Sequence, residues 1–175
     1  QYQFRAYGGG IGNGKTSVGA GLAYYLSICF PENLGFIGRW DGKELRLTTI
    51  ATFLDLVPRE MIKTHNSQMG IIEFKREYGG SKILYSDLKE TRFIKNMTLG
   101  WFWIDQSEEI DADRMDLLVT RLRKQTYLYD EYDRCFGVAP TYGLLTFNPE
   151  GSDHFLYDYF HEKSPNRKSN YKLYM

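Results

Sequence analysis

This 175-residue sequence has few cysteines, no long apolar run and no net charge, and each of these three properties limits the kind of protein it can be. Only two cysteines occur, Cys29 and Cys135, too few for a disulfide framework, so a reducing compartment is expected. No apolar run approaches the roughly 20 residues that span a bilayer, and no signal peptide opens the chain. Lys and Arg number 22, as do Asp and Glu, so the net charge is zero. The total charge therefore does not indicate a nucleic-acid partner, although a local basic patch is compatible with it.

The length and composition favour one folded domain. The hydrophobic share of 42% is ordinary, whereas the aromatic share of 16% is high, with 14 tyrosines and 11 phenylalanines. A chain of 175 residues can bury a sizeable core. The sequence opens on Gln1 rather than on methionine, which is compatible with a piece excised from a longer chain.

The chain is organised around a glycine-rich segment, residues 8–16, with the sequence GGGIGNGKT. The phosphate-binding pattern G-x-x-x-x-G-K-[ST] needs a strand before it and a helix after it. Residues 2–7 alternate as a strand does, and residues 17–30 have helical spacing, so both flanks agree. Four residues of the segment fit the pattern: Gly9, Gly14, Lys15 and Thr16.

These residue types suit a nucleotide triphosphate. Glycines let backbone N–H groups converge on an anion, and a helix N-terminus adds partial positive charge. Lys15 would reach the β- and γ-phosphates, and Thr16 would place its hydroxyl on Mg²⁺. The alternative is a glycine-rich turn that only closes a strand–helix corner. The expected nucleotide-binding residues form one run: Gly9, Gly10, Ile11, Gly12, Asn13, Gly14, Lys15, Thr16 and Ser17.

The rest of the chain alternates strands and helices. We expect strands at residues 34–40, 61–63, 71–75, 82–85, 99–104, 142–147 and 171–174, and helices at 43–56, 111–124 and 155–160. We expect a loop or short helix at 91–98 and a surface loop in the tyrosine-rich residues 125–135. The first helix has an apolar stripe of Val18, Leu22, Tyr25, Leu26 and Cys29. Gly19 and Gly21 weaken the helix locally, but we expect them to let it pack tightly on the sheet. This alternation predicts an α/β fold with a mostly parallel central sheet and helices on both faces.

Three expected strand ends carry the residues that matter for chemistry. Gly8 follows the first strand, Asp105 ends the run LGWFWI, and Asn148 follows the strand at 142–147. Ligands of such sheets bind at the carboxyl ends of the strands. We therefore expect these three ends to meet in one active site.

Asp105 is the expected second metal ligand. The apolar run before it has no alternation, which is typical of a central strand covered on both faces. A carboxylate at such a strand end would hold Mg²⁺, directly or through water, across from Thr16. The alternative, that Asp105 only ends a strand, is disfavoured by the phosphate-loop pattern upstream.

The residues after Asp105 leave the catalytic base open. Hydrolysis needs a carboxylate near the attacking water, and many such ATPases place a glutamate directly after the metal aspartate. Gln106 stands at that position, and an amide can orient water but cannot take its proton. Either Glu108 or Glu109 has the role, or the chain is a slow or disabled hydrolase, of which an engineered Glu-to-Gln trap is one form. A solvated helix entry is the other interpretation of both glutamates.

Several stretches, in order, resemble the ATPase domain of the large terminase subunit, the DNA-packaging motor of tailed bacteriophages and related viruses. The phosphate loop is generic to many ATPases, but Asn148-Pro149-Glu150-Gly151 with Phe155-Leu156-Tyr157 downstream is more particular. The resemblance covers nearly the whole chain. Its other stretches are Phe36-Ile37-Gly38-Arg39, Glu44-Leu45-Arg46, Thr48-Thr49, Phe93-Ile94-Lys95-Asn96, WFWIDQSEEI and Arg121-Leu122-Arg123.

The resemblance implies an ASCE-type P-loop ATPase that uses ATP and Mg²⁺. Thr146 and Asn148 would form the coupling element that senses the γ-phosphate. A basic residue would reach the nucleotide of a neighbouring copy in a ring, and Arg92 is the first candidate, with Lys95, Arg121 and Arg123 as rivals. The implied partners are double-stranded DNA, bound through its phosphates, copies of the chain in a ring, the portal and the small terminase subunit, with no membrane. The implied location is the cytoplasm of the infected host cell.

The sequence also departs from this family. Gln106 is the main departure. Only seven residues precede Gly8, so the expected adenine-contacting segment is missing, and the nuclease domain is missing after Asn170. We therefore expect a single motor module over residues 1–175, truncated at both ends, with weak adenine binding. The other hypotheses are a different P-loop enzyme, such as a helicase-like ATPase or a nucleotide kinase, and a nucleotide-binding assembly module that does not hydrolyse.

Overall fold

The computed structural model describes residues 3–10, 12–149 and 154–175. Its centre is an eight-stranded sheet in which β10 through β5 run parallel and β4 and β3 complete one edge as antiparallel strands. The order across the sheet is β10 (Tyr171–Tyr174), β1 (Phe4–Gly8), β9 (Tyr142–Phe147), β6 (Trp101–Asp105), β2 (Leu34–Arg39), β5 (Lys82–Asp87), β4 (Ile71–Phe74) and β3 (Ile62–Asn66). The expected mostly parallel α/β sheet is confirmed.

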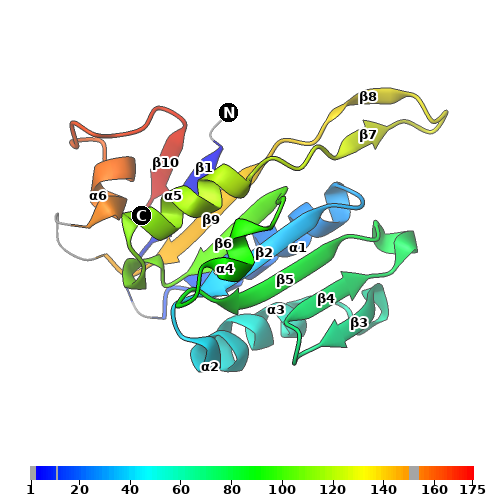
Figure 1. Cartoon of the computed structure of the whole chain (residues 1–175), viewed down its shortest axis with the longest axis horizontal. Helices are drawn as coiled ribbons and strands as arrows, with labels where there is room; N and C mark the ends of the chain where they lie inside the picture. The colour runs from blue at the N-terminus through cyan, green and yellow to red at the C-terminus, as the bar shows by residue number, and fades with distance from the viewer. Residues whose placement is uncertain (1–2, 11, 150–153) are drawn as a thin grey trace.

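Helices cover both faces of the sheet, also as expected (Figure 1). One face is covered by α1 (Lys15–Cys29) and by a continuous helical segment made of α2 (Gly42–Glu44), the π-helical η1 (Leu45–Ile50) and α3 (Ala51–Leu56). The other face is covered by α4 (Arg92–Lys95), α5 (Ala112–Arg121) and α6 (Phe155–Phe160). Three 3₁₀ turns join elements: η2 (Arg59–Met61), η3 (Arg76–Tyr78) and η4 (Ser107–Glu109).

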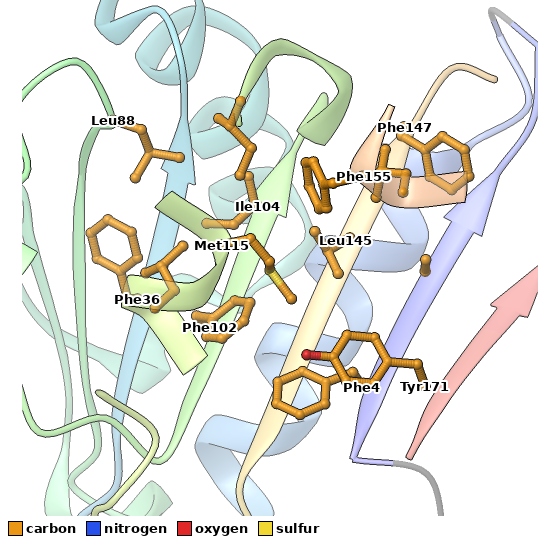
Figure 2. Packing of buried hydrophobic residues seen from close by; sticks show 14 of the residues in the cluster. Phe4, Phe36, Leu88, Phe102, Ile104, Met115, Leu145, Phe147, Phe155 and Tyr171 are labelled. Carbon is orange, nitrogen blue, oxygen red and sulfur yellow. The ribbon is translucent and has the colours of Figure 1, made fainter. Parts of the chain in front are cut away.

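Each face of the sheet has its own core. Figure 2 shows the α5 and α6 side, where Phe102 and Leu145 of the central strands pack with Met115 of α5 and Phe155 of α6. On the opposite face, the side chains of Trp101 and Trp103 lie under α1 and α3. All five residues of β6 are buried, so the unalternating run LGWFWI is the central strand that its pattern predicts.

The strand order brings the three expected ends together. β9 lies between β1 and β6, and its register places Phe147 beside Gly8 and Thr146 beside Asp105. The phosphate loop, the end of β6 and Asn148 therefore share one edge of the sheet. This arrangement confirms the expected convergence of Gly8, Asp105 and Asn148.

The expected tight packing of the first helix through Gly19 is confirmed, whereas the apolar stripe is buried only at Leu26. Val18, Tyr25 and Cys29 are exposed, and α1 instead packs on the sheet through a side of mostly small residues: Gly19, Ala20, Ala23, Leu26 and Ser27. A Cβ on Gly19 would lie 2.2 Å from the indole of Trp103, so only glycine allows this approach. The large tryptophan on the sheet side displaces large residues from the helix.

The expected surface loop at 125–135 is wrong. The segment forms a two-stranded antiparallel hairpin of β7 (Tyr127–Tyr129) and β8 (Cys135–Val138), which extends away from the sheet (Figure 1). Asp130 organises its turn by accepting hydrogen bonds from the backbone N–H groups of Tyr132 and Arg134, both at 2.9 Å. The short loop between two aromatic-rich runs therefore pairs them. No helix in the described ranges is long and apolar enough to cross a membrane.

Candidate functional site

The phosphate loop is held open by glycines in left-handed backbone conformations. Gly12 has φ 84° and Gly14 has φ 69°, values that other residues adopt at a cost. Gly14 is the N-cap of α1, a 15-residue helix, and no side chain of the described residues caps it. The first N–H groups of the helix therefore have no partner within the helix and face the loop. The Nζ of Lys15 folds back over the loop and donates to the carbonyl oxygens of Gly9 and Gly10 at 2.8 and 2.7 Å. Ile11 lies outside the described residues.

Asp105 sits at the centre of a cage of hydroxyl groups. Its side chain is buried, with 3% exposed. Thr49 and Thr146 donate to its two carboxylate oxygens at 2.7 and 2.6 Å. The hydroxyl of Thr16 lies 3.3 Å from both oxygens, so the phosphate loop and the end of β6 share one site. Trp103 orients the cage from below, because its Nε1 donates to the Thr146 hydroxyl at 2.9 Å.

This cage fits a divalent cation. In the described part of the chain, Asp105 contacts hydroxyls but pairs with no basic side chain, whereas a buried carboxylate normally has a cationic or metal partner. The described residues contain no group of three or more His, Cys, Asp or Glu arranged to hold a metal unaided. Mg²⁺ bound with a nucleotide takes one or two protein ligands and completes its shell with phosphates and water. Thr16 and Asp105 supply that donor set.

Thr49 is a site residue that sequence reasoning assigned no role. It lies on the π-helical segment η1 and is fully buried, with its hydroxyl directed at Asp105. A polar residue among buried Leu45 and Ile50 was the available signal. The partner is 56 positions away, so the contact itself could not be inferred from local pattern.

Gln106 does not occupy an ordinary helical or strand conformation. It has φ 49° and leads from β6 into η4. Its side-chain oxygen accepts a hydrogen bond of 2.5 Å from the guanidinium of Arg39. Because that oxygen is engaged, Gln106 is held at the end of β2.

Arg39 is the second site residue without a role in the sequence analysis. It ends β2, has 6% of its surface exposed, and also donates to Thr48 at 2.9 Å. Its Nε lies 3.7 Å from a carboxylate oxygen of Glu109. Burial raises the pKa of Glu109 above its usual range, and the nearby Arg39 guanidinium opposes that rise. The buried arginine at the end of β2 therefore contacts both Gln106 and Glu109.

Glu108 lies on the other side of the same edge. Its Oε1 accepts a hydrogen bond of 2.6 Å from the amide of Asn148. Among the described residues, its Oε2 is buried and has no hydrogen-bond partner. Ser107, between Gln106 and Glu108, is anchored by donating to the backbone oxygen of Thr146 at 3.3 Å. Glu108 therefore joins the expected coupling residues, whereas Glu109 joins Arg39.

Comparisons with known proteins now identify the family. The sequence profile described as "Phage terminase large subunit" matches residues 54–175. The chain belongs to the phage terminase large subunit family. No curated protein sequence matches it significantly.

Solved terminase structures share the fold. The large terminase of a thermophilic bacteriophage in complex with ATP-gamma-S superposes with a TM-score of 0.75 at 14% identity, over 99% of this chain and 39% of that chain. The complex of the same terminase with ADP gives 0.72 at 14% identity, over 99% and 40%. The large terminase ATPase domain of Thermus phage P74-26 gives 0.70 at 11% identity, over 99% and 75%. The chain therefore spans well under half the length of the thermophilic phage's large terminase and has the fold of a terminase ATPase domain.

The expected trans-acting basic residues lie outside the network around Asp105. Arg92 is exposed at the start of α4, and no described contact joins it to the phosphate loop. Arg121 donates to the backbone oxygen of Lys95 at 2.6 Å, which links the end of α5 to α4. The side chains of Asn13 and Ser17 are exposed around the loop. Most of the expected site residues lie together at this edge of the sheet, and Arg92 does not. The residues brought together are Thr16, Asp105, Gln106, Glu108, Glu109, Thr146 and Asn148.

Proposed function

We propose that this chain is the ATP-hydrolysing motor domain of a terminase large subunit, which drives double-stranded DNA into a procapsid. One observation carries the proposal: Thr16 of the phosphate loop touches the carboxylate of Asp105, 89 positions away. A triphosphate held by the loop would therefore lie against the only carboxylate enclosed by hydroxyls among the described residues. The structures of the thermophilic phage terminase in complex with ADP and with ATP-gamma-S support nucleotide binding.

Each residue of the site would have a separate role in binding the nucleotide or Mg²⁺, set by its position. The N–H groups of the loop and of α1 would bind the phosphate oxygens, and Lys15 would exchange its two loop carbonyls for the β- and γ-phosphates. Thr16 and Asp105 would hold Mg²⁺, which supplies charge neutralisation on the phosphates when bound. Thr49 and Thr146 keep the Asp105 carboxylate in one orientation, because each donates to a different oxygen. Preorganised groups of this kind lower the barrier to phosphoryl transfer.

Glu108 is the stronger candidate for the group that orients and deprotonates the attacking water. One of its oxygens is fixed by Asn148, and the other is buried without a partner among the described residues, so it is available to a water. Glu109 is engaged by Arg39, and Gln106 has no basic oxygen to offer. If neither glutamate were the base, the chain would be a slow or disabled hydrolase, because the amide of Gln106 cannot take the proton of water.

Asn148 and Thr146 would couple the nucleotide state to movement. Asn148 bonds to Glu108, and Thr146 bonds to Asp105, so both catalytic carboxylates are tied to the end of β9. Loss of the γ-phosphate would change these two contacts first. The chain beyond β9 leads through residues 150–153, which lie outside the described residues, to α6.

The partners follow from the family and stay part of the proposal. Double-stranded DNA would be bound through its phosphates, so binding should be sequence-blind and weakened by salt. Copies of the chain would assemble in a ring, with Arg92 as the candidate trans arginine, alongside the portal and the small terminase subunit. Packaging would take place in the cytoplasm of the infected host cell.

The test is ATP hydrolysis by the wild type and by Lys15→Ala. The variant should lose about 10²-fold or more in kcat/KM, because Lys15 is the loop's only cation in reach of the phosphates. Lys43→Ala, an exposed lysine of α2, is the matched control and should hydrolyse normally. Turnover that is unchanged in Lys15→Ala would refute the proposal.

A second candidate function is a nucleotide-binding assembly module that does not hydrolyse. Gln106 favours this function, because its side-chain oxygen accepts a hydrogen bond from Arg39 and an amide cannot act as a general base. Single-turnover measurements distinguish the two. An inactive wild type that becomes active as Gln106→Glu would establish this second function.

A further inference from the structure

Helix α1 presents apolar side chains to solvent. Val18 is 42% exposed and Tyr25 is 55% exposed, although their spacing with Leu22 and Cys29 is that of a core-facing stripe. The stripe continues into a groove of about 360 Å³ at the amino-terminal end of the sheet. The groove is lined chiefly by Leu22, Tyr25, Leu26, Phe30, Pro140 and Leu144. We call the stripe and the groove together the α1 face.

The β7–β8 hairpin carries a second exposed apolar face. Tyr127 pairs with Val138 across the hairpin, and Tyr129 pairs with Cys135 after a register shift, with Phe136 next to Cys135 on β8. Their exposed fractions are 50% for Tyr127, 49% for Val138, 59% for Tyr129 and 67% for Phe136. A two-stranded hairpin is at best marginally stable in water by itself, so such a face gains from being covered. We call these four residues the hairpin face.

We propose that the hairpin face of one copy packs onto the α1 face of a second copy. The two surfaces differ in shape, since one is a projecting ribbon and the other is a groove beside a helix. The groove and the hairpin both lie toward the amino-terminal end of the sheet, because Pro140 of the groove follows the hairpin closely, whereas the stripe begins at Val18 near the phosphate loop at the opposite end. The contact thus leaves the nucleotide site open.

Charge favours a second copy over DNA as the occupant. Residues 125–138 contain Asp130, Glu131 and Asp133 against one basic residue, Arg134, so the hairpin has a net charge of −2 and would repel phosphates. The α1 face carries the opposite charge, because Arg5 lines the groove, where its guanidinium lies 5.5 Å from the centre of the Tyr142 ring. An acidic turn at the tip of an aromatic ribbon therefore complements a basic apolar groove.

The contact is heterologous, which has a geometric consequence. Because each copy offers one hairpin face and one α1 face, every copy can bind two neighbours, and repetition gives a closed ring or an open array. This contact is separate from the one through which Arg92 of the proposed function would reach a neighbour's nucleotide, so it does not rest on that function. Its chemistry depends on apolar contact and not on ATP hydrolysis.

Two single-face variants test the inference. Phe136→Asp disables the hairpin face, and Tyr25→Asp disables the α1 face, while Met69→Asp changes an equally exposed apolar residue elsewhere. Sedimentation over a concentration series should show self-association of the wild type and of Met69→Asp. Each single-face variant should raise the apparent dissociation constant about tenfold or more. An equimolar mixture of the two variants should form a one-to-one dimer and nothing larger, because only one intact contact remains possible.

The two native cysteines offer a second measurement, since Cys29 lies on the α1 face and Cys135 on the hairpin, both exposed. A short bismaleimide should join Cys29 of one copy to Cys135 of another, and Cys29→Ser or Cys135→Ser should abolish that product. Cys135–Cys135 products alone would indicate hairpin-to-hairpin pairing and would overturn the inference.

The inference also fails if the wild type stays monomeric up to about 100 µM, well above the micromolar range of specific contacts, or if Tyr25→Asp associates normally. Binding of a fluorescent ATP analogue is measured in the same variants as a folding control. Normal nucleotide binding with no self-association would overturn this inference alone, whereas loss of nucleotide binding only in Lys15→Ala bears on the proposed function.

Discussion

The two ends of the central sheet break the usual rule of burial in opposite ways. At the carboxyl-terminal end, polar side chains are buried: Asp105 is 3% exposed, Thr146 1% and Arg39 6%. At the amino-terminal end, aromatic side chains are exposed, for example 67% for Phe136 and 69% for Tyr132. A buried polar cluster marks a site for a small charged ligand, and an exposed apolar face marks a site for protein. The polar site around Asp105 and the apolar groove with the hairpin therefore lie at opposite ends of the sheet.

The largest expected effect tests the buried end. Asp105→Asn should lower hydrolysis by about 10²–10³-fold or more, because the variant loses the charge that holds Mg²⁺. Wild type should melt at a higher temperature with Mg–ATP than without it, and Asp105→Asn should lose most of that increase. Asp87→Asn, at the end of β5 and separated from β6 by β2, is the matched control, since its described contact is to the backbone N–H of Lys89. An equal loss in both variants would mean that Asp105 has no special role.

The next effect separates the two glutamates. Glu108→Gln should reduce kcat by about 10²–10⁴-fold, as expected for loss of a general base, while Glu109→Gln should change it by less than about tenfold. The raised pKa of Glu109 gives a further check. If Glu109 were the base, the acid limb of the kcat profile would lie above the usual glutamate range, and activity would fall as pH drops through that raised pKa. The reverse ranking of the two variants would assign the base to Glu109.

Much of the site could be predicted because it depends on local pattern. The local sequence pattern predicts a phosphate loop at Lys15 and Thr16 and a strand end at Asp105. The parallel strands of the sheet bring these two segments to the same edge. Thr49 and Arg39 could not be assigned, because their partners Asp105 and Gln106 are 56 and 67 positions away. The register of β2 beside β6 brings Arg39 to the end of β6, and the helical segment η1 that follows β2 brings Thr49 to Asp105.

The buried side of α1 and the hairpin could not be predicted, for two different physical reasons. Helical spacing predicts which residues of α1 lie on one side, but not which side faces the sheet. The bulk of Trp103 decides that, by leaving room only for Gly19 and its small neighbours. The hairpin was missed because its pairing covers few residues and buries little. In both places the large apolar residues face outward.

A third experiment compares the two sides of α1. Gly19→Ala should lower the free energy of unfolding by about 1–3 kcal/mol, because its Cβ would overlap the Trp103 ring. Gly21→Ala should raise it by about 0.5–1 kcal/mol, since no atom lies within 4 Å of the added Cβ and alanine favours a helix. Urea unfolding of both variants measures the pair. Equal effects would mean that the side of α1 in contact with the sheet is misassigned.

The smallest expected effect compares an exposed aspartate at each end of the sheet. The backbone N–H of Glu44 and the ammonium of Lys89 hold the pKa of Asp41 at about 2, and the backbone N–H of Arg134 lowers the pKa of Asp130. Because both folded pKa values lie below the unfolded value of about 3.9, each carboxylate stabilises the fold above that pH and loses its contribution as the pH falls through the folded pKa. Asp41→Ala should therefore melt below wild type at pH 7, with a difference that closes toward pH 2. Asp130→Ala should leave the global melting temperature nearly unchanged at any pH, because the hairpin can open by itself. A difference for Asp41→Ala that stays constant from pH 7 to pH 2 would show that its charge does not stabilise the helix that begins at Gly42.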